Sequence, residues 1–99
     1  MLLKLTLAVR FEWDATKERA NIAKHGVDFR EAQLAFTDPN RLVAVDEGHS
    51  REEPRLFCIG HTGRGVLTVR FVYQSRESIR IIGAGYWRKG KKLYEKANR

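Results

Sequence analysis

Short turns separate the apolar segments in the second half of this chain, and that spacing restricts the fold more than any other feature. The turns at His61–Gly65 and Gln74–Glu77 are too short to contain a crossover helix. Strands that follow each other so closely pair antiparallel, because a parallel connection needs about a dozen or more residues. We therefore expect a four-stranded antiparallel sheet, with strands at residues 42–45, 56–61, 66–73 and 78–84.

Helix signals precede and follow this predicted sheet. Asp14 is a good N-cap for a helix over residues 15–24, and Gly26 can end that helix in the left-handed conformation. Asp28 then begins a second helix, with an acidic residue three positions later as in a capping box. A basic helix is expected over residues 87–98.

These elements predict an α+β fold with two N-terminal helices, the antiparallel sheet and a C-terminal helix. Residues 1–99 are expected to form a single domain, in which residues 1–10 are an N-terminal extension or an edge strand. No apolar run approaches the roughly 20 residues that a membrane-spanning helix needs, and we expect no membrane partner.

Alternation along the predicted strands separates a core face from an outer face. The side chains expected in the core are Phe29, Ala32, Phe36, Leu67, Val69, Phe71, Tyr73, Ile79 and Ile81. Arg70 and Arg80 lie on the outer faces of neighbouring strands, so they can approach each other if the strand register allows it.

The positive charge of the chain is concentrated in its last third. The whole chain has a formal net charge of +7, but residues 64–99 alone hold ten basic and two acidic side chains. A polyanion is the natural partner for such a surface, either nucleic acid or an acidic protein. The alternative is that these charges serve solubility only.

Several side chains are candidates for chemistry or ligand binding. Lys24 and His25 lie at a predicted helix end, where His25 can act as a general acid or base or simply stabilise the helix dipole. Arg80 lies among isoleucines, so it either binds an anion such as phosphate or pairs with a carboxylate, and pairing is favoured for Arg55. The segment 86–94 interleaves aromatic and basic residues, which suits single-stranded RNA and equally a helix that packs its rings on the sheet.

Other chemical signatures are missing from the sequence. His25, His49 and His61 show no metal-ligand spacing, and the chain carries no cofactor motif, so we expect neither a metal nor a cofactor. His49 is interpreted as a solvated loop residue and His61 as a strand-end residue. The single cysteine, Cys58, lies in an apolar run and is expected to be a buried, inert thiol, which fits a reducing, cytoplasmic setting.

Between about residues 11 and 95 the sequence resembles the BrnT-like toxins of bacterial type II toxin–antitoxin systems. The most specific parts of the resemblance are residues 24–27 and 79–82. The residues that carry it are Phe11, Glu12, Trp13, Asp14, Asn21, Lys24, His25, Gly26, Val27, Phe29, Glu31, Ala32, Phe36, Asp38, Pro39, His49, Arg55, Ile59, Gly60, Leu67, Val69, Ile79, Arg80, Ile81, Ile82, Ala84, Tyr94 and Glu95.

The resemblance implies a RelE-like fold and an RNA-cleaving toxin that blocks translation. It also implies a cognate BrnA-like antitoxin, through which the complex would bind promoter DNA. The hypothesis that follows is a metal-independent endoribonuclease, because RNA supplies its own nucleophile and cationic side chains can stabilise the charged transition state. Its proton carrier is Lys24 or His25, its phosphate binders are Arg70 and Arg80, and its RNA-positioning residues are Arg55, Arg88, Lys89, Lys91, Lys92 and Tyr94.

Two glycines depart from the pattern that the resemblance implies. Gly85 stands where an arginine is expected, and Gly90 stands where a glutamate is expected one turn before Tyr94. If the arginine contacts the scissile phosphate, this protein has lost that contact, or Arg88 or Lys89 replaces it. A second hypothesis is therefore a basic binding module that pairs with an antitoxin, or binds RNA, without catalysis.

Overall fold

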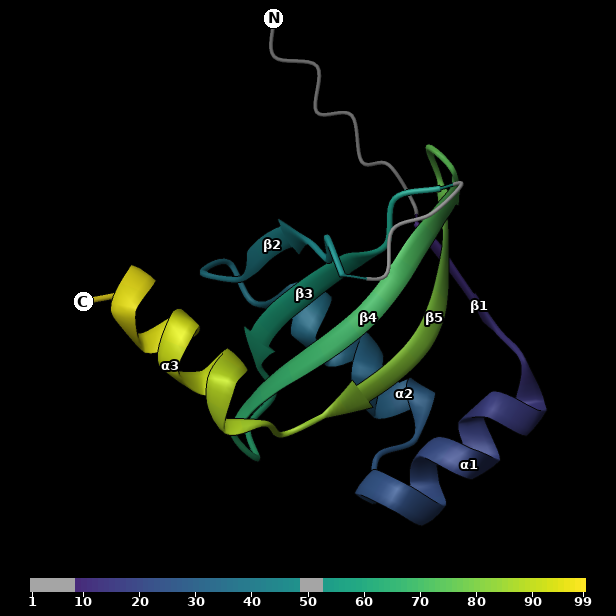
Figure 1. Ribbon diagram of the computed structural model, residues 1–99, viewed down its shortest axis with the longest axis horizontal. Coiled ribbons are helices and arrows are strands. Elements are labelled where there is room, and N and C mark those ends of the chain that lie inside the picture. Colours follow the sequence, from purple (N-terminus) through teal and green to yellow (C-terminus); the bar gives the residue numbers. More distant parts are fainter. Residues whose placement is uncertain (1–8, 49–52) are drawn as a thin grey trace, which may run out of the picture.

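A computed structural model describes residues 9–48 and 53–99 of the chain. The predicted α+β class is confirmed, and Figure 1 shows how the elements are arranged. In chain order they are β1 (Arg10–Trp13), α1 (Ala15–His25), α2 (Phe29–Ala32), the 3₁₀ helix η1 (Gln33–Thr37), β2 (Leu42–Val45), β3 (Leu56–His61), β4 (Val66–Ser75), β5 (Ser78–Gly85) and α3 (Arg88–Ala97).

The sheet has five strands and is mixed, so the predicted four-stranded antiparallel sheet is incomplete. Strands β2 to β5 form the expected antiparallel meander, and β1 adds to β5 in parallel at one edge, in the order β1-β5-β4-β3-β2. The extension or edge strand predicted for residues 1–10 lies almost entirely outside the described residues, and the strand β1 at Arg10–Trp13 was not predicted. Local turn signals predict hairpins, but they contain no information on where a strand this far away in the sequence will pair.

The N-terminal helices begin and end where their sequence signals predict. The Asp14 carboxylate accepts hydrogen bonds from the backbone N–H groups of Thr16 and Lys17, and Gly26 ends α1 with φ of 67°. Asp28 caps the second helix, but that helix tightens into η1 after Ala32. The two predicted N-terminal helices are therefore α1 and a short α2 that continues as a 3₁₀ turn.

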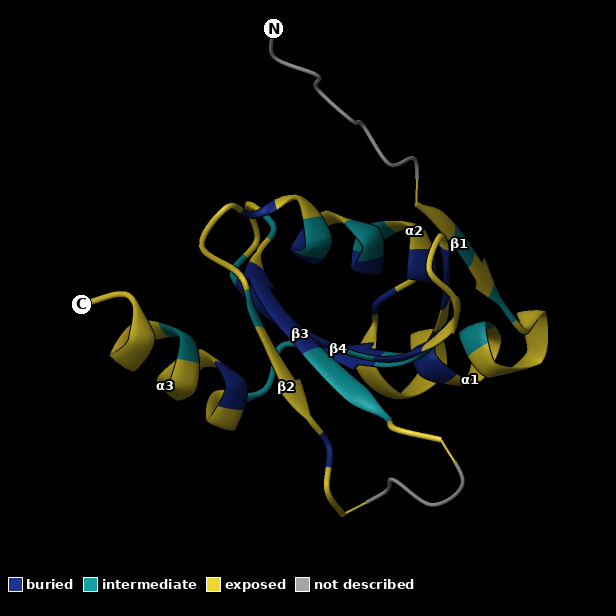
Figure 2. Cartoon of the chain, turned by 90° about the horizontal axis from the view of Figure 1, so that it is seen from above, coloured by how far each residue is buried: buried dark blue, intermediate teal, exposed yellow. Residues whose placement is uncertain are grey.

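Helices lie on both faces of the sheet. The elements α1, α2 and η1 pack on the face formed by β3, β4 and β5, whereas α3 packs on the opposite face against β3 and β4 (Figures 1 and 2). Within the described residues no helix is long and apolar enough to cross a membrane.

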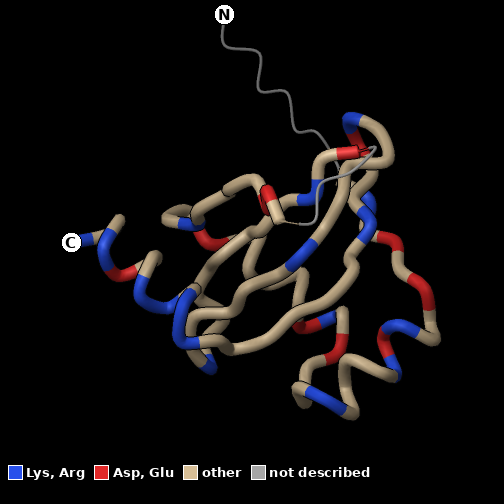
Figure 3. Tube along the Cα trace, in the orientation of Figure 1, with Lys and Arg blue, Asp and Glu red and all other residues tan. Residues whose placement is uncertain are grey.

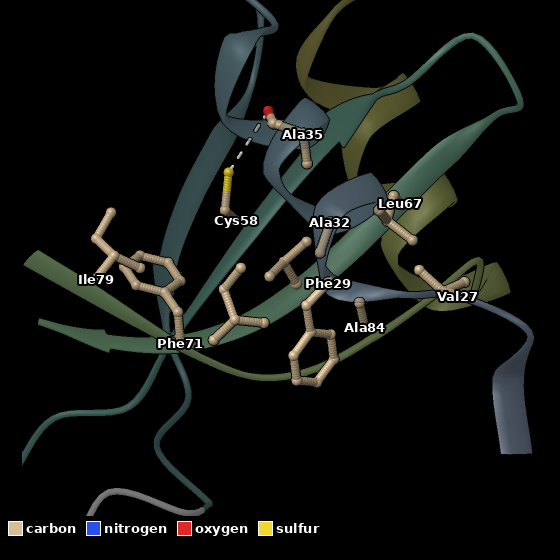
Figure 4. Packing of buried hydrophobic residues seen from close by; sticks show 11 residues of the cluster. Val27, Phe29, Ala32, Ala35, Cys58, Leu67, Phe71, Ile79 and Ala84 are labelled. Carbon is tan, nitrogen blue, oxygen red and sulfur yellow. Dashed lines mark hydrogen bonds between the residues drawn. The ribbon is translucent and has the colours of Figure 1, made fainter. Parts of the chain in front are cut away.

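The core lies between the sheet and the N-terminal helices, as Figure 4 shows. The predicted core residues are buried there or, for Phe36, packed against it, but Tyr73 is 52% exposed. Cys58 is fully buried, and its thiol lies 3.7 Å from the carbonyl oxygen of Ala35. Burial raises the pKa of this thiol to about 12, so the predicted inert cysteine is confirmed.

One hydrogen bond attaches α3 to the connection between η1 and β2. The Tyr94 hydroxyl donates to Asp38 Oδ2 at 2.6 Å, and the backbone N–H of His61 donates to the same oxygen at 2.7 Å. These donors hold the pKa of Asp38 below its usual value of 3.8.

Replacing Tyr94 with Phe should lower the thermal unfolding midpoint by a few degrees at neutral pH, since it removes a donor to a carboxylate. A carboxyl with a lowered folded-state pKa stabilises the fold above its unfolded pKa and loses that contribution as pH falls. The difference between wild type and Tyr94→Phe should therefore shrink at pH 3, as measured by thermal unfolding at both pH values. Tyr73→Phe is the control, and an equal loss in both variants would contradict the assignment.

Candidate functional site

The crossing from β5 to α3 brings distant parts of the chain together at one end of the sheet. After β5 ends at Gly85, Tyr86 and Trp87 lead to α3 on the opposite face of the sheet (Figure 1). The Trp87 ring contacts the His25 ring edge to face, with centroids 5.2 Å apart. The end of α1 therefore meets the beginning of α3, with His25 exposed beside it.

A cleft lined by three cations lies at this crossing. Its volume is about 620 Å³, and we call it the cationic cleft. The lining residues are Arg64, Gly65, Val66, Tyr86, Trp87, Arg88 and Lys91. Figure 3 shows the accumulation of basic segments at the beginning of α3, beside the end of the sheet.

One wall of the cationic cleft is fixed by a hydrogen-bond network. The Arg64 guanidinium donates from Nη1 to both oxygens of Glu31 at 2.9 Å and lies 5.1 Å from the centroid of the Tyr86 ring. The Tyr86 hydroxyl lies 2.5 Å from Glu31 Oε2 and 2.6 Å from Thr62 Oγ1. Burial, followed by the hydrogen bond to Glu31, raises the pKa of Tyr86, so the phenol stays neutral.

A second, largely apolar groove separates α3 from the outer face of the sheet. We call it the α3 groove; it has a volume of about 410 Å³ and shares Trp87 with the cationic cleft. Its lining residues are Phe57, Ile59, Thr68, Arg70, Trp87, Lys89, Gly90 and Leu93. Thr68 Oγ1 is buried and has no hydrogen-bond partner among the residues that the structure describes.

Gly85 and Gly90 each make room for a neighbouring side chain. A Cβ atom at position 85 would overlap the Trp87 indole, and one at position 90 would overlap Thr68 Oγ1. The two departures from the BrnT-like pattern are thus packing features, because an arginine at 85 is incompatible with the position of Trp87.

The predicted site residues fall into separate groups. Arg88 and Lys91 line the cationic cleft, beside Trp87 and the predicted proton carrier His25. Lys89 and Arg70 line the α3 groove. Lys24 and Lys92 are exposed, but neither lines these two hollows.

Arg70 and Arg80 share the outer face of the sheet, as alternation predicts. Arg80 pairs with Val72, which lies two residues after Arg70 on β4. Arg70 lies 3.6 Å from Asp46 Oδ2, and Arg80 lines a shallow pocket beside Glu12 of β1. Neither arginine lines the cationic cleft.

The remaining candidates lie elsewhere. Arg55 is partly buried just before β3, and its backbone oxygen accepts from the N–H of Asp46. The Tyr94 hydroxyl donates a hydrogen bond to Asp38 Oδ2. His61 is exposed at the end of β3, whereas His49 lies outside the described residues. In the described part of the chain no three His, Cys, Asp or Glu side chains gather as a metal site requires.

Arg64 is a site residue that was not predicted from the sequence. It lies in the turn between β3 and β4, from which only the antiparallel connection was predicted. Its side chain is 62% exposed and faces the cationic cleft. One feature of the sequence could have indicated this role. Arg64 is the first cation of the basic last third of the chain, and it lies in a turn that the fold brings next to α3.

Comparisons with known proteins identify the family and the fold of this chain. Residues 13–90 match the family described as the ribonuclease toxin, BrnT, of type II toxin–antitoxin systems. This chain belongs to the BrnT family. Its fold is similar to the crystal structure of the Brucella abortus ribonuclease toxin BrnT, with a TM-score of 0.60 and 25% sequence identity over 83% of this chain and 97% of that one. A comparison with curated proteins finds no significant match.

In this BrnT-family chain, Gly90→Ala should destabilise the fold although alanine favours helices. Alanine in an exposed helix interior is typically about 1 kcal/mol better than glycine, but here its methyl group meets the buried Thr68 side chain. Overpacking of this kind costs about 1–3 kcal/mol, which urea unfolding can measure. Thr68→Ala with Gly90→Ala should recover stability, and a Gly90→Ala protein as stable as wild type would contradict this packing.

Proposed function

We propose that this ribonuclease-family chain is a metal-independent endoribonuclease that cleaves RNA at the cationic cleft. It would act in the cytoplasm and block translation. Membership of a type II toxin–antitoxin family implies an antitoxin partner. We propose that this partner is BrnA-like and that promoter DNA is bound only through it.

The strongest support for an anionic ligand is the charge at the beginning of α3. The first five residues of this helix include Arg88, Lys89, Lys91 and Lys92, with no acidic residue in the first turn and no side-chain N-cap. Cations at a helix N-terminus oppose the helix dipole and typically cost about 0.3–1 kcal/mol each. An RNA phosphate in the cationic cleft would reverse this repulsion, because the dipole and the side chains then attract the same group.

The proposed reaction uses the ribose 2′-hydroxyl as nucleophile. His25 or Lys24 takes the proton of that hydroxyl, and the oxygen attacks the adjacent phosphorus. The bond to the 5′-oxygen breaks as water, or the side chain that took the first proton, gives a proton to that oxygen. Arg88, Lys91 and Arg64 stabilise the negative charge on the phosphorane. Arg70 and Arg80 bind phosphates further along the strand, on the outer face of the sheet.

The second candidate, a basic binding module without catalysis, is favoured by one observation. Trp87 occupies the space that a side chain at position 85 would need, so the arginine that the resemblance implies has no equivalent there. In this case the cationic cleft would hold RNA or an acidic antitoxin without cleaving RNA.

Purified protein should cleave RNA in excess EDTA and leave 2′,3′-cyclic phosphate ends. His25→Ala should lower the cleavage rate about 100-fold or more, since general acid–base catalysis contributes roughly 10²–10⁴-fold. Gel electrophoresis of a labelled RNA measures the cleavage rate, and end-group analysis identifies the 2′,3′-cyclic phosphate. His61→Ala is the matched control, because His61 is exposed but lies outside the cationic cleft. Cleavage abolished by EDTA would refute the metal-independent mechanism, and no cleavage in any condition would favour the binding module.

Binding to single-stranded RNA should weaken steeply with salt. Each lost phosphate contact reduces the slope of log affinity against log salt by about 0.7 for a single strand. The double variant Arg88→Gln with Lys91→Gln should therefore have a slope smaller by about 1.4. Lys96→Gln, which removes a charge from the last turn of the same helix, should leave the slope unchanged. Equal slopes in all three proteins would exclude the cationic cleft as the phosphate site.

A further inference from the structure

The α3 groove adjoins the cationic cleft but differs from it in chemistry. Its exposed lining is mainly apolar and includes the rings of Phe57 and Trp87 and the half-exposed side chain of Leu93. Two cations, Arg70 and Lys89, complete the lining. Trp87 belongs to both hollows, so a ligand held in the cationic cleft lies next to the α3 groove.

We propose that the α3 groove binds one unstacked RNA base while the cationic cleft and the two groove cations hold the neighbouring phosphates. This inference rests on RNA being the ligand in the proposed function and assigns its base-binding subsite. Aromatic faces with adjoining cations are the combination by which proteins hold single-stranded nucleic acid. Lys89, and Arg70 beside Asp46, add positive charge to the lining of the groove, which suits the phosphates that neighbour a bound base.

The size of the α3 groove favours a base over a protein segment. A volume of about 410 Å³ is within the range of small-molecule sites. A stable protein–protein interface instead buries more than about 1,000 Å² of surface, which a groove of this size cannot provide alone.

The experiment compares two uncleavable ligands of equal charge. One is a short single-stranded RNA with 2′-O-methyl groups, and the other is a 2′-O-methyl ribose-phosphate oligomer of the same length without bases. Because the chain has two tryptophans, Trp13→Phe leaves Trp87 as the only fluorescent indole. The RNA should quench Trp87 and bind about 5- to 150-fold more tightly than the abasic oligomer, which corresponds to about 1–3 kcal/mol for a stacked base.

Two matched leucine variants locate the effect. Leu93→Ala removes one wall of the α3 groove and should reduce the preference for the RNA over the abasic oligomer at least threefold. Leu34→Ala changes a side chain of equal exposure, 45% against 46%, on η1 and should retain the preference. Arg88→Gln with Lys91→Gln should weaken both ligands equally.

The outcomes separate this inference from the proposed function. Equal affinity for the RNA and the abasic oligomer overturns the base-binding groove, even if RNA cleavage in EDTA is observed. A Leu93→Ala protein that keeps the RNA preference but loses binding to its antitoxin also overturns it, because the groove then belongs to a protein partner. Base-dependent binding without cleavage supports the groove and refutes catalysis.

Discussion

The Asn21 carboxamide holds the end of the sheet in the position on which the site depends. Its Nδ2 donates to the carbonyl oxygens of Val27 and Ala84, and its Oδ1 accepts from the N–H of Ala84. Strand β1 pairs with β5 only as far as Ile81, so within the described residues Ala84 has no strand neighbour on that side. A buried side chain thus satisfies backbone groups that the edge of a sheet would otherwise leave unpaired. The same bonds attach the second half of α1 to the end of β5, immediately before the chain crosses to α3.

Two glycines after Ala84 determine how closely the chain packs where it crosses from β5 to α3. Gly85 leaves space for the Trp87 indole, and Gly90 lets α3 approach Thr68. The indole then reaches His25 and separates the cationic cleft from the α3 groove. The two glycines that depart from the BrnT-like pattern are therefore matched to the side chains beside them. An arginine introduced at position 85 alone would have to displace Trp87, so a single substitution cannot restore the implied side chain without rearranging the crossing.

Local signals predicted most of the fold but only part of the site. The caps at Asp14 and Asp28 and the short turns each act within a few residues, and the structure confirms them. The alternation along β4 holds as far as Phe71 but is wrong at Tyr73, which is 52% exposed. The parallel pairing of β1 with β5 joins residues far apart in the sequence, so no local pattern contained it. For the same reason alternation placed Arg70 and Arg80 on one face, but nothing in the sequence showed that Arg64 would meet Glu31 or that His25 would meet Trp87.

The two ends of α3 have opposite electrostatic and packing properties. Its first turn carries cations that the helix dipole repels, whereas its second half is attached by Tyr94 to Asp38 and by the Asn98 side chain to the backbone oxygen of Asn40. A short helix is marginal without tertiary contacts, so this attachment is what allows the unfavourable charges to persist. The second half of the helix is therefore anchored away from the cationic cleft. Its first turn lies beside the cleft, and there the cations and the helix dipole oppose each other. That is the arrangement expected when the missing interaction is supplied by a bound anion rather than by the protein itself.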